Sequence, residues 1–191
     1  MNTYKAYKLR IYPTDLQREL IEKTFGCTRY VYNNFLAERK NKYEESKTKV
    51  HVYEQLKKLT DLKREKEWLR EIDSCALQAS VYNLDNAFQG FFYGKGYPKF
   101  RAKGVHESFR TNNTLNTYKN KKYESIRIDF NKRIITLPKL KEVKFRGYRT
   151  TKEMVGKIKS ATISKDANKY FVSILVEVPF IKYSINPTSI V

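Results

Sequence analysis

The sequence is short of several residue types, and each shortage excludes a class of function. It has only two histidines and two cysteines among its 191 residues. Neither cysteine stands at the spacing of a zinc site, and His51 and His106 stand alone in polar segments, so we expect no metal and no cofactor. No apolar run approaches the roughly 20 residues of a membrane-spanning helix, and the N-terminus lacks the apolar segment of a signal peptide. We therefore expect a reducing, cytoplasmic setting and no membrane partner.

Motifs for catalysis are equally scarce. The glycines do not form a phosphate-binding loop, and there is no Gly-x-Ser-x-Gly turn that would expose a nucleophile. Two-metal catalysis needs carboxylates that converge from separate strands. Those of the C-terminal half are scattered and outnumbered by cations: Asp129, Glu142, Asp166 and Glu177. We therefore expect that the chain is not an enzyme on its own.

Negative charge is the largest shortage. The chain has 20 acidic residues against 39 lysines and arginines, a net charge of +19. Residues 95–149 alone hold sixteen cations and four acids, which is a net +12. Such an excess repels itself unless a polyanion neutralises it, and its concentration in one segment favours a binding surface over diffuse solubility charge.

Aromatic residues are abundant, and many of them neighbour a cation. There are fifteen tyrosines, including those of the pairs Arg29-Tyr30, Lys42-Tyr43 and Lys122-Tyr123. Tyrosine can stack on bases while a cation meets phosphate, so the combination favours nucleic-acid binding. For any single tyrosine, packing in a core or on an edge strand remains the alternative.

Hydrophobic periodicity predicts one strand followed by four helices. Residues 3–12 alternate like a strand, Pro13 ends it, and Thr14 with Gln17 forms a capping box. A helix then runs to Gly26, and a second runs from Cys27 to Glu45 with Arg39 among the cations on its outer side. Two helices joined at a glycine resemble a helix-turn-helix, although many helical hairpins share that pattern. The third helix is expected over 53–67.

The fourth predicted helix begins after Asp73, whose carboxylate suits an N-cap. Its apolar residues recur at helical spacing, and Gly94 and Gly96 stop it before a basic, aromatic loop that ends at Lys103. The expected buried stripe comprises Leu77, Val81, Leu84, Phe88, Phe91 and Phe92.

Strand patterns dominate after Gly104. Alternation predicts strands over 124–130, 133–137, 139–149, 159–164 and 169–178, with tight turns at 131–132 and 165–168. The polar cluster 108–117 reads as a loop that could hydrogen-bond base edges or sugars. Because a lone first strand cannot remain unpaired, we expect it to join the later strands, with the helices inserted between them. The fold class is therefore α+β.

Several segments, in order and spacing, resemble the N-terminal half of the TnpB (OrfB) proteins of insertion sequences. The motifs that carry the resemblance are 8–13 with Gln17, 28–33, Trp68-Leu69, 76–78, Asn83-Leu84, Ala87-Phe88, Phe91-Phe92, 96–100, 108–111 and 137–140. That family comprises RNA-guided DNA endonucleases related to the type V CRISPR effectors. The resemblance implies a small, OB-like wedge β-barrel with a four-helix recognition domain inserted after its first strand. The implied domains are 1–13 and 104–180 for the barrel, 14–103 for the helices, and 181–191 as a linker toward a nuclease domain.

The resemblance also implies partners and residues. The partners are a guide RNA derived from the element and double-stranded DNA, in a bacterial or archaeal, nucleoid-associated setting. By position, the candidates for reading a short DNA motif are Tyr53, Ser74, Cys75, Gln78 and Thr114. Gln78 is the clearest, because an amide can pair bidentately with adenine. Candidates for backbone and RNA contacts are Lys8, Arg10, Arg29, Asn33, Lys99, Arg101, Lys103, Arg110, Lys139 and Lys144.

The family's RuvC-like catalytic aspartates would follow the last residue of this sequence. We therefore expect a module that binds nucleic acid without cutting it. Two alternatives remain: one half of a split nuclease completed by a separate polypeptide, and a guide-independent DNA-binding regulator that uses the first two helices as a helix-turn-helix.

Overall fold

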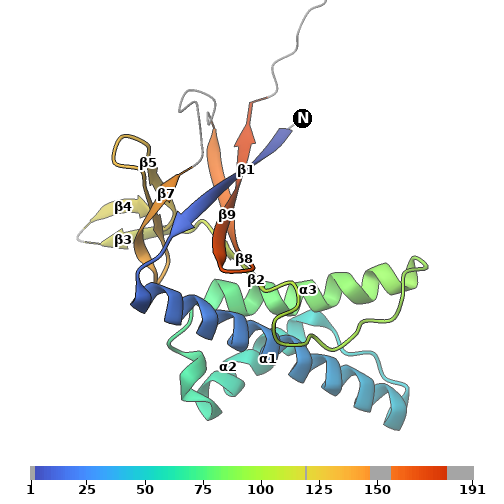
Figure 1. Ribbon diagram of the computed structural model, residues 1–191. Coiled ribbons are helices and arrows are strands. Elements are labelled where there is room, and N and C mark those ends of the chain that lie inside the picture. Colours follow the sequence, from blue (N-terminus) through green and yellow to red (C-terminus); the bar gives the residue numbers. More distant parts are fainter. Residues whose placement is uncertain (1–2, 119, 147–155, 180–191) are drawn as a thin grey trace, which may run out of the picture.

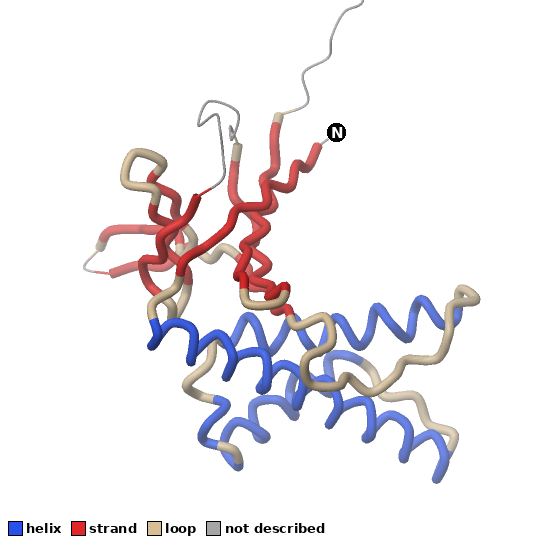
Figure 2. The backbone as a smooth tube through the Cα atoms, viewed as in Figure 1, coloured by secondary structure: helices blue, strands red, loops and turns tan. Residues whose placement is uncertain are grey.

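The computed structural model describes residues 3–118, 120–146 and 156–179. An antiparallel sheet lies on one side of the molecule and a layer of helices on the other (Figures 1 and 2). The elements, in chain order, are β1 (Thr3–Tyr12), α1 (Asp15–Ser46), α2 (Val52–Glu65), a single 3₁₀ turn (Glu67–Leu69), α3 (Ser74–Phe92), β2 (Ser108–Asn112), β3 (Leu115–Tyr118), β4 (Lys121–Glu124), β5 (Arg127–Asp129), β6 (Ile134–Leu137), β7 (Lys141–Arg146), β8 (Lys157–Asp166) and β9 (Lys169–Val178).

The first strand pairs with later strands, as the sequence predicts. β1 lies in the middle of a seven-stranded sheet of order β2-β8-β9-β1-β7-β6-β5, while β3 and β4 form a separate two-stranded ribbon. Antiparallel pairing joins β1 to β9 along almost its whole length and to β7 at its end. The predicted hairpin of β8 and β9 is confirmed, as is the shorter hairpin of β5 and β6.

The sheet is open, so the prediction of a closed barrel is wrong. Its edge strands β2 and β5 are not hydrogen-bonded to each other in the described residues. The Asn113 side chain stands between them instead. Its oxygen accepts from the Ile126 amide at 2.9 Å, and its nitrogen donates to the Ile158 carbonyl at 3.0 Å. This side chain links the end of β2 to the residue before β5, and the chain leaves the sheet there to form the β3–β4 ribbon.

The prediction of four helices is also wrong, because the first two are one. α1 runs unbroken through Gly26 and Cys27, so the helices number three in the described residues. The physical reason is a continuous buried stripe from Ile21 to Leu36, which compensates the roughly 1 kcal/mol that a glycine costs inside a helix. The helix-turn-helix predicted at Gly26 is therefore not formed.

Local signals at helix starts are confirmed. Thr14 accepts from the Gln17 amide while the Gln17 side chain accepts from the Thr14 amide, which completes the predicted capping box. The Gln17 side chain also donates to the carbonyls of Leu140 and Glu142 at 2.9 and 2.7 Å. The start of α1 is thereby fastened to β7.

Two cores stabilise the molecule. The sheet core includes Ile21 and Phe25 of α1 and Ala76 of α3, while the helical core contains the later part of the α1 stripe together with α2 and α3 residues. Phe25 packs edge-on against Phe109 of β2 at 5.6 Å. α1 and α3 each contribute to both cores, so they fix the helical layer against the sheet.

Four further expectations need correction or lie outside the described residues. Phe91 and Phe92, predicted on the buried stripe of α3, are exposed, because the helix extends beyond the helices that cover its first half. The cluster 108–117, predicted as a loop, contributes to strands β2 and β3. The predicted linker 181–191 and the end of the predicted strand 139–149 lie outside the described residues. In the part of the chain that is described, no helix is long and apolar enough to cross a membrane.

Candidate nucleic-acid interface

The N-terminal end of α3 is held against the sheet by one carboxylate. The Asp73 side chain accepts from the Cys75 amide at 3.2 Å, which confirms the predicted N-cap. Its other oxygen accepts from the hydroxyl of Thr111, a buried residue of β2. The first turn of α3 is thereby placed on β2 by a charge-assisted bond as well as by the packing of Ala76.

We predict that Thr111→Val lowers the free energy of unfolding by about 1.5 kcal/mol, because it removes a hydrogen bond to a carboxylate without changing the side-chain volume. Urea unfolding measures the loss. The matched control is Thr162→Val on neighbouring β8, a partly buried threonine for which we expect no loss. Equal effects of the two substitutions would contradict the role assigned to Thr111.

A groove of about 820 Å³ opens beside this end of α3. It is bounded by the start of α3, by the β3–β4 ribbon and by strands β5 to β7, and both Cys75 and Thr114 line it. Two of the candidate motif-reading residues, from distant parts of the sequence, therefore share one groove. Burial and the nearby Asp73 carboxylate raise the pKa of the Cys75 thiol, which therefore stays neutral at pH 7.

The other three candidates lie outside the groove lining. Ser74 is exposed at the start of α3, and Gln78 is exposed one turn later on the same helix face. Ser74 accepts from Lys63 Nζ at 2.8 Å. Tyr53 is exposed near the start of α2, about 15 Å along the helix from Lys63 at 1.5 Å per residue. The structure thus groups Ser74, Cys75, Gln78 and Thr114 at one end of α3 and leaves Tyr53 apart.

Several polar residues of this region were not among the candidate site residues. Asn116 and Tyr123 face each other across the β3–β4 ribbon and line the groove, and Arg127 lies over the Tyr123 ring at 5.7 Å. Lys63 was missed because its neighbour Ser74 comes from another helix. The sequence did give a signal for Asn116, in the polar cluster 108–117, and for Tyr123, in the cation-aromatic pair Lys122-Tyr123.

The groove is polar rather than strongly basic. Its lining holds three cations, Arg127, Lys139 and Lys141, against the carboxylates of Asp73, Glu124 and Glu142. Its hydroxyl, amide and thiol groups suit contacts with base edges, which need donors and acceptors rather than net charge. The described residues contain no group of three or more metal-ligating side chains.

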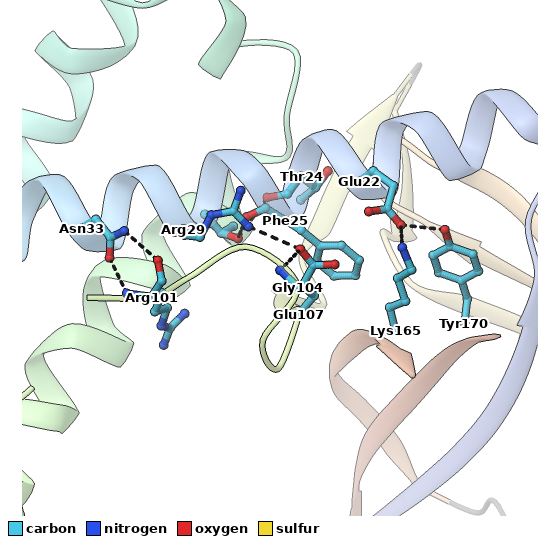
Figure 3. A network of polar contacts seen from close by, with 11 residues as sticks. Glu22, Thr24, Phe25, Arg29, Asn33, Arg101, Gly104, Glu107, Lys165 and Tyr170 are labelled. Atoms are coloured by element: carbon cyan, nitrogen blue, oxygen red, sulfur yellow. Dashed lines mark hydrogen bonds and ion pairs between the residues drawn. The ribbon is translucent and has the colours of Figure 1, made fainter. Parts of the chain in front are cut away.

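The candidate backbone contacts divide into two groups. Some are exposed and form no ion pair with a described carboxylate: Lys8, Arg10, Lys99, Lys103, Arg110, Lys139 and Lys144. Others bind within the chain (Figure 3). Arg29 pairs with Glu107 at 3.4 Å, and the Asn33 side chain exchanges hydrogen bonds with the Arg101 backbone at 2.8 and 3.0 Å. The Arg101 guanidinium lies 3.9 Å from the centre of the Tyr32 ring. These contacts fix the loop after α3 along α1.

A second set of contacts joins α1 to the β8–β9 hairpin (Figure 3). The Glu22 carboxylate accepts from Lys165 Nζ at 2.8 Å and from the Tyr170 hydroxyl at 2.7 Å. Burial alone would raise the pKa of Glu22, but these two hydrogen bonds outweigh it and the pKa is lowered. Together with the Arg29–Glu107 pair, Glu22 keeps the helices in one orientation against the sheet.

Comparison with known proteins finds several proteins that are similar to this chain. A family model described as a helix-turn-helix domain, that of OrfB of IS605, matches residues 1–48, which form β1 and the single helix α1 here. InsQ of Escherichia coli (strain K12), named as an RNA-guided DNA endonuclease, is 28% identical over 181 residues, 93% of this chain and 41% of that protein. A protein of Streptomyces pristinaespiralis named as an RNA-guided DNA endonuclease is 34% identical over 102 residues, 52% of this chain and 25% of its own length.

A smaller relative is covered almost completely. The virulence protein VsdF of Salmonella dublin is 34% identical over 111 residues, which are 52% of this chain and 93% of VsdF. Among solved structures, a Cas12f1–sgRNA–target DNA complex aligns with a TM-score of 0.46 at 13% identity, over 93% of this chain and 49% of that one.

The chain belongs to the TnpB (OrfB) family. It spans about two fifths of the length of InsQ and a quarter of the Streptomyces protein.

Proposed function

We propose that this chain is the nucleic-acid-binding module of a TnpB-like protein. It would hold a guide RNA derived from the mobile element and read a short DNA motif beside the target, without nuclease activity of its own. In this proposal the open sheet serves as the wedge and the helices serve as the recognition part. A separate nuclease domain or polypeptide would supply cleavage.

One observation carries the proposal: the groove at the start of α3. Cys75 and Thr114, which the family resemblance selects independently of each other, line the same groove, and Ser74 and Gln78 continue from it along α3. The alternative of a helix-turn-helix regulator is favoured by the description of the family model over residues 1–48, but α1 continues through Gly26, where the turn between its two helices was expected.

The first experiment identifies the RNA. The tagged chain is purified from cells of its source, and the co-purified RNA is sequenced. We expect enrichment of one structured RNA transcribed from the end of the element. RNA that mirrors the total cellular pool would contradict guide binding. Incubation of the RNA complex with motif-bearing DNA and Mg²⁺ should leave the DNA intact, and cleavage by this chain alone would contradict its role as a binding module.

Gln78→Ala should weaken binding to duplexes that carry the preferred motif by about 1–3 kcal/mol and should leave binding to other duplexes unchanged, because a bidentate amide contact reads one base. The preferred motif is found by selection from a randomised duplex library with the RNA complex, and affinities are measured by fluorescence anisotropy. Asn86→Ala, which removes an exposed amide two turns further along α3, is the matched control. A uniform loss on all duplexes would mean that Gln78 supports structure rather than reading.

A further inference from the structure

The outer face of β1 carries an unusual set of side chains. Tyr7, Leu9 and Ile11 point into the core, so Lys8, Arg10 and Tyr12 point outward. Arg146 of β7 lies directly opposite Arg10, and Lys144 lies directly opposite Tyr12. Phe171 of β9 lies opposite Arg10 on the other side. We call this surface the β1 platform; it comprises Lys8, Arg10, Tyr12, Lys144, Arg146 and Phe171.

The cations of the β1 platform lie over its aromatic rings. The guanidinium groups of Arg10 and Arg146 are 5.0 and 5.5 Å from the centre of the Tyr12 ring. Lys8 Nζ is 4.6 Å from the centre of the Phe171 ring. The Tyr12 side chain is 39% exposed, which makes its ring the accessible one of the group.

The positive charge of the β1 platform is not neutralised by the described part of the chain. None of its four cations forms an ion pair with a described carboxylate, whereas Lys159 and Lys165 of the same sheet pair with Glu177 and Glu22. Like charges directly opposite each other, as in Arg10 and Arg146, destabilise an antiparallel pair. An anion bound between the two arginines would relieve this repulsion.

We propose that the β1 platform binds unpaired nucleotides of RNA. The cations contact successive phosphates, and an unstacked base lies against Tyr12 and the guanidinium planes beside it. A duplex offers phosphates but keeps its bases stacked inside, so it would use the cations and leave the aromatic rings without a partner. The inference rests on the proposed function for the source of the RNA, while the chemistry at Tyr12 stands independently of any guide.

The test uses the full chain and a 12-nucleotide single-stranded RNA containing 2-aminopurine, with a duplex RNA and the matching single-stranded DNA as further probes. We expect quenching of 2-aminopurine fluorescence on binding. Tyr12→Leu should weaken binding of single-stranded RNA about tenfold, because it keeps an apolar side chain and removes the ring. Tyr12→Phe should bind within about twofold of the unmodified protein, and duplex RNA should bind equally to all three proteins.

The contribution of the two arginines to phosphate binding is tested separately. Arg10→Gln combined with Arg146→Gln should reduce the slope of log affinity against log salt by about 1.4 for single-stranded RNA. Unfolding curves establish that each variant is folded. If Tyr12→Leu binds single-stranded RNA as tightly as the unmodified protein, stacking is refuted. Equal affinity for single-stranded DNA and RNA would overturn the assignment to RNA.

Failure of this inference is distinguishable from failure of the proposed function. The Tyr12 variants are measured on synthetic oligonucleotides, whereas guide binding is judged by the RNA recovered from cells. Recovery of an element RNA together with unchanged binding by Tyr12→Leu would overturn only the β1 platform. A tenfold loss without any enriched cellular RNA would support the β1 platform and overturn guide binding.

Discussion

Arg39→Ala is expected to lower the free energy of unfolding by about 3 kcal/mol, because it breaks a largely buried polar network that joins all three helices. Arg39 Nε donates to Gln55 Oε1 of α2, and its Nη2 donates to Asp85 Oδ1 of α3, both at 2.9 Å. Its side chain is only 9% exposed. The guanidinium also lies 5.0 Å from the centre of the Phe88 ring.

The large effect follows from what the substitution leaves behind. Asp85 would keep its charge and lose its cation, retaining only the hydrogen bond from Gln89 at 2.9 Å. Gln55 is fully buried and would lose the donor to its oxygen, while its nitrogen still donates to the Phe35 carbonyl at 3.0 Å. Arg39→Lys keeps the charge but cannot reach both acceptors in the same geometry, so we expect an intermediate loss.

Urea unfolding followed by circular dichroism measures the difference, and Arg64→Ala is the matched control. Arg64 pairs with Asp61 at 3.0 Å on the exposed side of α2, where such a pair contributes at most about 0.5 kcal/mol. If the two alanine variants lose similar stability, the Arg39 network does not hold the helices together. Loss of the network would also loosen α3, and with it the surface that carries Gln78.

The sequence predicts features whose causes are local. The alternation of β1, the β8–β9 hairpin and the caps at Thr14 and Asp73 depend on neighbouring residues, and all are confirmed. The helix end predicted at Gly26 is wrong, because the buried face of α1 continues on both sides of this glycine and its packing keeps the helix intact. Arg39 was expected on an outer face because its partners Gln55 and Asp85 come from other helices.

Non-local pairing limits what sequence reasoning can reach. Closure of the sheet depends on whether two edge strands meet; here they do not, and the Asn113 side chain after β2 bonds Ile126 and Ile158 at that end of the sheet. The same limit applies to the groove. Helical spacing relates Ser74 to Gln78, but no spacing relates Cys75 to Thr114, and only the family resemblance selected both residues. The β1 platform also required the strand register, since Arg146 comes from a strand far along the chain.

Gly156→Ala is expected to cost about 3 kcal/mol, because the added methyl group has no room and the backbone is strained. An added Cβ at this position would lie 2.3 Å from the Glu177 carbonyl oxygen and 2.9 Å from Val176 Cγ1. The φ angle of Gly156 is 137°, a conformation that side chains with a Cβ rarely adopt. The obstacle is the backbone of β9, which cannot move without disturbing its pairing with β1 at Tyr4.

Substitutions at two other glycines separate the effect of the steric clash from that of backbone strain. Gly104 has a φ of 80° but open space around it, so Gly104→Ala should cost only about 1 kcal/mol from backbone strain. Gly26 lies in α1 with only Arg29 Nη2 within 4.0 Å, so Gly26→Ala should stabilise by about 1 kcal/mol. Urea unfolding orders the three variants, and amide exchange should accelerate at the paired ends of β1 and β9 in Gly156→Ala alone. If Gly156→Ala costs no more than Gly104→Ala, the β9 backbone yields to the methyl group and the start of β8 is less tightly held than its contacts indicate.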